Sequence, residues 1–63
     1  MTKEQIFRDY SDSTFSAAEY WSVMTQAQQK LFGSFEIFRA ETLRDAGIPE
    51  ERIAEIMKKE AAQ

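Results

Sequence analysis

The sequence contains no cysteine and no histidine, and these two absences exclude several kinds of site. Without cysteine there is no disulfide, and without either residue a zinc ion would lack its usual sulfur and nitrogen ligands. The commonest general base and the most reactive thiol nucleophile are missing as well. We therefore expect a protein that is not an enzyme and that holds no cofactor and no metal.

Glycine and proline are scarce too, with two glycines and one proline in 63 residues. The sequence shows neither the alternation typical of strands nor a glycine-rich phosphate loop. Long apolar runs are absent, so we expect neither a secretory signal nor a membrane-spanning segment. The net charge of −3, without a cluster of basic residues, argues against nucleic-acid binding. A soluble, cytoplasmic protein is the resulting expectation.

The sequence does contain clear signals for where helices begin and end. Thr2 with Gln5, and Ser16 with Glu19, each have the spacing of a capping box, in which two side chains satisfy unpaired backbone amides at a helix start. A short first helix is therefore predicted, followed by a connection over residues 11–14 and a new helix from about residue 17. The apolar side of the first helix consists of Ile6, Phe7 and Tyr10.

Helical periodicity then continues from Ala17 to Ala46, which predicts one long central helix. Gly33 and Ser34 mark the point where this helix is expected to kink or to split in two, because glycine costs about 1 kcal/mol against alanine inside a helix. Gly47 can adopt the left-handed conformation that closes a helix.

A C-terminal helix is predicted to restart directly after this glycine. Pro49 is tolerated at a first helical position, and the acidic and basic residues at the two ends of the segment complement the helix dipole. The break at residues 47–48 is so short that this helix should fold back on the central one as an αα-hairpin. Its apolar side consists of Ile53, Ile56 and Met57.

The predicted fold class is therefore all-α, as a single helical domain over residues 1–63. It combines a short N-terminal helix, a long central helix with a possible kink at Gly33, and a C-terminal helix folded back as an αα-hairpin. A chain of this size has a core barely large enough for independent stability. Efficient packing, or association with another chain, is needed to compensate.

The central segment has an apolar sector that looks too wide for such a small domain. On one continuous helix at 100° per residue, a core stripe about 80° wide would contain Tyr20, Met24, Ala27, Leu31, Phe35, Phe38 and Thr42. A second line beside it would contain Trp21, Phe32 and Leu43, with Val23 on the other flank. The sector then spans roughly 200°, whereas one-sided packing needs little more than about 100°.

This excess predicts a binding surface made of Trp21, Phe32, Arg39 and Leu43. Arg39 projects onto the same line as Trp21, and tryptophan with arginine is typical of interface hot spots. We expect the surface to be covered by a protein partner or by a second copy of the chain. The sequence leaves one alternative open, in which the other helices cover the whole sector and the aromatics form the core of a compact monomer.

The functional hypothesis from the sequence is non-catalytic protein binding. On this hypothesis the protein is a small helical regulator or inhibitor, such as an antitoxin, an anti-repressor or a phage-encoded anti-defence (anti-CRISPR) protein. One alternative is a homo-oligomeric structural or assembly module.

A second alternative is a nucleic-acid binder, because "AETLRDAGIPEERIAEIM" has the order of a helix-turn-helix. Glu50 and Glu51 lie where that motif would meet phosphates, which argues against it. The same pattern, over about the last third of the chain, resembles the small dimerisation hooks of bacterial Sin-type repressor and anti-repressor pairs, and no function is transferred from this resemblance.

Overall fold

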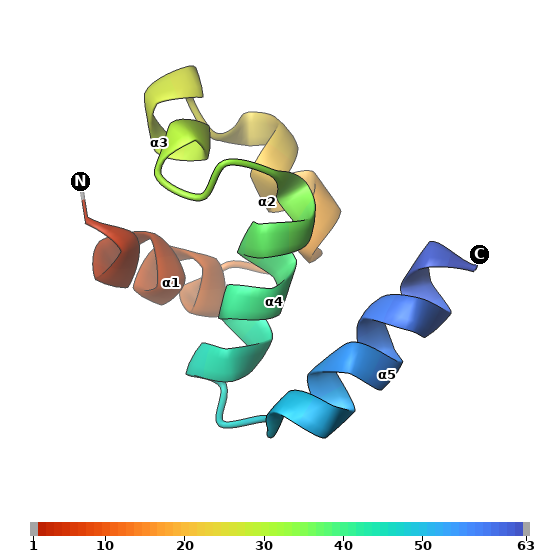
Figure 1. Cartoon of the computed structure of the whole chain (residues 1–63). Helices are drawn as coiled ribbons and strands as arrows, with labels where there is room; N and C mark the ends of the chain where they lie inside the picture. Colours follow the sequence, from red (N-terminus) through yellow and green to blue (C-terminus); the bar gives the residue numbers. More distant parts are fainter. Residues whose placement is uncertain (1, 63) are drawn as a thin grey trace.

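The computed structural model describes residues 2–62, and this part of the chain folds into five helices without strands (Figure 1). The helices are α1 (Lys3–Asp12), α2 (Ala17–Val23), α3 (Gln26–Lys30), α4 (Phe35–Asp45) and α5 (Glu50–Ala61). The predicted all-α fold class is therefore confirmed. Figure 1 shows α1, α2 and α3 grouped around α4, with α5 beside α4 at the edge of the molecule.

The two predicted capping boxes are both present. Thr2 Oγ1 accepts a hydrogen bond from the backbone amide of Gln5, and the Gln5 side chain accepts one from the Thr2 amide. Ser16 and Glu19 do the same at the start of α2. Helix α1 extends to Asp12, so the first two residues of the predicted connection over 11–14 are helical.

The central segment is not one long helix, and its first interruption was not predicted. Met24 has extended backbone angles, and Thr25 forms a third capping box with Gln28 at the start of α3. Thr25 is compatible with helical periodicity and also with an N-cap, because its hydroxyl can donate to a backbone carbonyl inside a helix or accept from a backbone amide at a helix start. The cap conformation occurs here, and the Met24 side chain is buried.

The second interruption lies at the predicted position. Gly33 has a φ of +96°, in the left-handed region that favours glycine. Ser34 then caps α4, its hydroxyl oxygen accepting a hydrogen bond from the amide of Ile37 at 3.3 Å. The chain is therefore split at Gly33, and the split re-aims α4 relative to α3.

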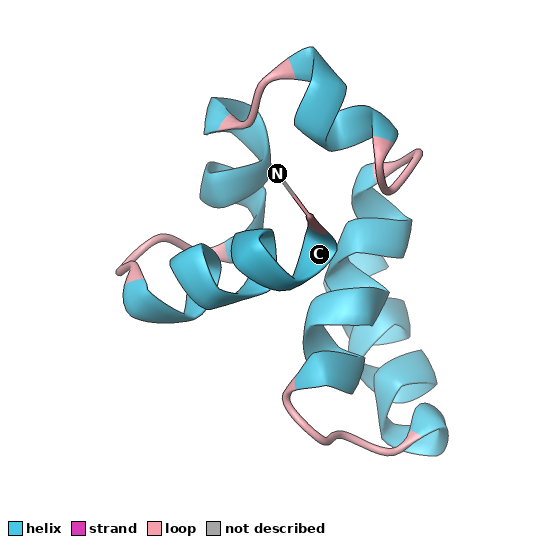
Figure 2. Ribbon diagram, turned by 90° about the vertical axis from the view of Figure 1, so that its left-hand side faces the viewer, coloured by secondary structure: helices cyan, strands magenta, loops and turns pink. Residues whose placement is uncertain are grey.

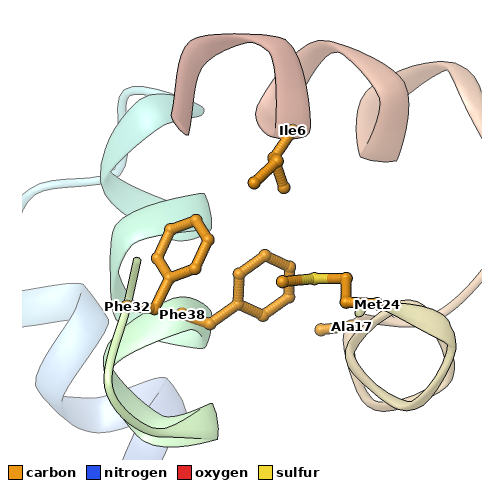
Figure 3. Packing of buried hydrophobic residues seen from close by; sticks show 5 residues of the cluster. All are labelled: Ile6, Ala17, Met24, Phe32 and Phe38. Atoms are coloured by element: carbon orange, nitrogen blue, oxygen red, sulfur yellow. The ribbon is translucent and has the colours of Figure 1, made fainter. Parts of the chain in front are cut away.

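The main core lies where α1, α2 and α4 meet. Figure 3 shows Ile6 of α1 and Met24 directed toward Phe38, with Phe32 beside it. Phe38 and Ile6 are fully buried. The buried cluster consists of Ile6, Ala17, Met24, Phe32 and Phe38, and half-buried Phe7, Tyr10, Tyr20, Trp21 and Phe35 pack against it.

The two interruptions overturn part of the predicted stripe. Leu31 and Ala27 were placed in the core on a continuous helix, yet both are exposed. Phe32 and Leu43 were placed on a separate outer line with Trp21, yet both are buried, at 4% and 6% exposure. The physical reason is that these residues belong to different elements, so a single helical projection does not describe their directions.

Helix α5 folds back on α4 as predicted, and Figure 2 shows the turn between the two helices. Gly47 has a φ of +86°. Its amide donates to the carbonyl of Arg44 at 3.0 Å, and the amide of Ile48 donates to the carbonyl of Leu43 at 3.1 Å, which is the Schellman pattern. Pro49, predicted at the first helical position, is the N-cap of α5, so the helix begins one residue later than predicted, at Glu50.

The unpredicted break can be tested with Thr25→Ala. Loss of the cap should lower the free energy of unfolding by about 1 kcal/mol. If residues 17–46 formed one helix, the same change should instead raise stability by about 0.5 kcal/mol, because alanine is the better helix former. Urea unfolding followed by circular dichroism gives the sign. Thr14→Ala, at an exposed position between α1 and α2, is the matched control and should change little.

Candidate functional site

Trp21 and Phe32, two of the predicted binding residues, belong to the aromatic packing around Phe38. The Trp21 ring centroid lies 5.5 Å from that of Phe38 and 6.5 Å from that of Phe32. Phe32 makes an edge-on contact with Phe38 at 5.0 Å. Truncating either side chain would therefore damage the core, so loss of binding in such a variant would not identify a contact surface.

Arg39 and Leu43, the other two predicted residues, lie together in a different part of the molecule, where Leu43 is buried and Arg39 is partly exposed. Both line a hollow between α1 and α4, whose other walls include Phe7 and Tyr10. The structure thus brings Trp21 together with Phe32, and Arg39 together with Leu43, but it does not bring all four onto one line.

The Arg39 guanidinium is bound to the carboxylate of Glu60 near the end of α5. Nε donates to both carboxylate oxygens, at 3.1 and 3.2 Å, and Nη2 donates to Oε2 at 2.9 Å. These hydrogen bonds raise the pKa of Arg39 and lower the pKa of Glu60. Arg44 makes a similar pair with Glu50 at the other end of the α4–α5 hairpin. Arg39 is therefore engaged in holding α5.

The surface formed by the described residues offers few groups for proton transfer or metal binding. Burial, followed by the Asp9 carboxylate, raises the pKa of Tyr20, so its hydroxyl stays protonated at neutral pH. Glu41 pairs with Lys3 at 3.1 Å, and the Lys3 ammonium also lies 5.2 Å above the Phe32 ring. Among residues 2–62, no three carboxylates gather in a way that could hold a metal ion.

Exposed apolar side chains provide the feature that the sequence did not locate. Ile37 and Leu31 are 49% and 43% exposed, and Val23 and Phe15 are also exposed. Ile37 lies beside Gly33, since a Cβ atom built on this glycine would be 3.7 Å from Ile37 Cδ1. Leu31 is two residues before the same glycine. Two large apolar side chains therefore flank the turn between α3 and α4.

A hollow adjoins this turn. It is lined by Trp21, Gln26, Gln29, Lys30 and Gly33. The Gln29 side chain donates a hydrogen bond to the backbone carbonyl of Trp21 at 2.8 Å, which fixes α3 against the end of α2. We call Leu31, Gly33 and Ile37, together with the residues lining this hollow, the Gly33 corner.

Most of the Gly33 corner lies in the segment of the chain that is poorest in charge, and Ile37 follows just after it. Between residues 20 and 35 the sequence has one charged residue, Lys30. Glutamine, methionine, hydroxyl and aromatic residues fill the remainder. Depletion of charge together with exposed apolar groups is the composition found at the centre of protein–protein interfaces. The signs of this corner in the sequence are the Thr25–Gln28 capping spacing and the Gly33–Ser34 pair, which end the helical periodicity.

Comparison with protein-family models, with curated proteins and with solved structures gives no match to this chain. None of the helices within residues 2–62 combines the length and the apolar character that crossing a bilayer requires.

The Arg39–Glu60 pair predicts part of the pH dependence of stability. Because folding lowers the pKa of Glu60 below its ordinary 4.5, the pair stabilises the folded chain above that pH. The contribution is lost as the pH falls through the lowered value. Glu60→Gln should therefore melt at a lower temperature than wild type at neutral pH, and the difference should shrink in acid.

The matched control is Glu55→Gln, at an exposed position on the same helix and outside the three ion pairs described for residues 2–62. Melting curves of the three proteins between neutral and acidic pH make the comparison. A constant difference between wild type and Glu60→Gln at every pH would contradict this account.

Proposed function

We propose that this chain is a non-catalytic protein-binding module, of the small regulator or inhibitor type, and that the Gly33 corner is its contact surface. The observation that carries the proposal is a pair of half-exposed apolar side chains at one turn, with Leu31 inside the segment of residues 20–35 that has one charge and Ile37 two residues beyond it. An apolar, nearly uncharged surface gains free energy when another protein covers it.

The surroundings of the corner support the proposal because they hold it in one shape. Ser34 caps α4 next to Ile37, and Gln29 ties α3 to Trp21. Phe32, directly between Leu31 and Gly33, is anchored in the core. A surface that is already ordered loses less conformational entropy when it binds. Of the binding residues predicted from the sequence, Trp21 lines the proposed surface, and Phe32 is buried in the core next to it.

The nucleic-acid alternative receives less support from the positions of the basic residues. Arg39 and Arg44 are paired with Glu60 and Glu50, and Lys3 is paired with Glu41. Binding to phosphates would require these cations to leave their carboxylates. The first turn of α5, which would enter the groove in a helix-turn-helix, carries Glu50 and Glu51.

The proposal predicts that Leu31→Gln with Ile37→Gln weakens partner binding while the protein stays folded. Both side chains are about half exposed and outside the buried cluster, so the melting temperature should change little. Losing two apolar contacts should weaken binding by about tenfold or more. Proteins enriched on the immobilised wild type, from extracts of cells that express it, would be compared by quantitative mass spectrometry with those enriched on the double variant.

The matched control for this experiment is Glu51→Gln with Glu55→Gln, two exposed changes on α5. It should retain the enriched proteins that the Leu31 and Ile37 variant loses. The same enrichment on wild type and on the corner variant would show that the Gly33 corner is not the contact surface.

A further inference from the structure

Helix α5 is attached to the rest of the molecule in a way that separates it from the main core. The buried cluster around Phe38 draws its residues from α1, α2, α4 and the turns between them, and none from α5. The packing of α5 is chiefly against α4, and Figure 1 shows its distal side facing away from the other helices. The α1–α4 body is therefore built without α5.

The direction of α5 depends on one short turn. Only residues 46–49 separate the two helices, and Gly47 supplies the left-handed conformation that reverses the chain. A different conformation at this residue would swing α5 away from its own α4 and leave both helices intact. Short hinge loops are places where a segment can exchange between two copies of a chain.

The contacts between α4 and α5 explain why α5 would not stay detached. Ile53 on α5 is buried, and because α5 packs chiefly on α4, opening the turn would expose it to water. Arg39 and Arg44 would lose their carboxylate partners on α5. A second copy of the chain offers the same apolar positions and the same charges, so it can restore every one of these contacts.

We propose that α5 exchanges between two copies of this chain, each α5 packing on the α4 of the partner and re-forming the Arg39–Glu60 and Arg44–Glu50 pairs between chains. The left-handed Gly47 favours the closed monomer, and the exchanged dimer increases with concentration by mass action. This surface is separate from the Gly33 corner, so the inference does not rest on the proposed function.

A pair of charge reversals tests the exchange directly. Arg39→Glu alone places two carboxylates against each other on α4 and α5, and Glu60→Arg alone places two guanidinium groups there. When the two variants are unfolded together and refolded as a mixture, an exchanged heterodimer has opposite charges at both α4–α5 contacts. A closed monomer of either variant has like charges.

We expect the refolded mixture to contain about tenfold more dimer than either variant alone, since both like-charge contacts are replaced by attractive ones. Light scattering behind a sizing column measures the dimer fraction, and mass labelling of one variant shows that the dimer is mixed. The double variant with both reversals in one chain is the folding control, because it restores an opposite-charge pair within the monomer. A mixture that stays monomeric would overturn the proposal.

The two glycines provide a second, matched test. Both have positive φ, and a Cβ atom would meet ordinary or open space at each, so alanine adds backbone strain alone at either site. Gly47→Ala should raise the dimer fraction severalfold, because opening the turn relieves that strain. Gly33→Ala should lower the melting temperature without producing dimer. Equal dimer fractions in these two variants would contradict a hinge at Gly47.

Repeating the mixing experiment in the background of Leu31→Gln and Ile37→Gln separates this inference from the proposed function. The heterodimer should persist, because the exchanged contacts do not involve the Gly33 corner. If it disappears there, the two copies associate through the corner and the exchange of α5 is refuted.

Discussion

Phe38 is the residue on which the arrangement of α1 to α4 depends. Its ring is fully buried, and ring centroids of Tyr10, Tyr20, Trp21 and Phe32 lie between 5.0 and 6.2 Å from its own. Isolated helices shorter than about twelve residues are marginal in water, and these four helices are all that short. Helices α1, α2 and α4 are therefore stable only while they contribute to the cluster around this ring, and α3 is held to the end of α2 by the hydrogen bond from Gln29 to the Trp21 carbonyl. The geometry of a small cluster replaces the large core that a chain of this length does not have.

This dependence also explains why the aromatic side chains point inward. Breaks before Thr25 and at Gly33 turn the chain twice, and the turns bring Trp21, Phe32 and Phe35 onto one centre. The same turns leave Leu31 and Ile37 about half exposed beside Gly33. Burial of one set of apolar residues and exposure of the other thus have a common origin.

Several of the helix starts and ends were predictable from the sequence. The capping boxes at Thr2 and Ser16, the split at Gly33 and the helix end at Gly47 each depend on neighbouring residues, and all are present. The break at Met24 was not predictable with the same arguments, because Thr25 fits a helix interior as well as a cap.

The missed break had large consequences for the site. A projection that assumes a continuous helix assigns Phe32 and Leu43 to an outer line and Leu31 to the core, and the structure reverses these assignments. The identity of the exposed residues follows from tertiary packing on Phe38, which periodicity does not encode. Arg39 illustrates the same limit, since its partner Glu60 is 21 positions away.

Trp21 is an intrinsic fluorescence probe that reports on one part of the molecule. It is the single tryptophan of the chain, and its ring contacts are with Phe32, Phe35 and Phe38 of the α1–α4 body. Its emission should change when α2 separates from α4, yet it has no ring contact on α5 among those described for residues 2–62. Trp21 emission therefore reports on the packing of α2 against α4, whereas the hydrodynamic radius reports on whether α5 lies on α4.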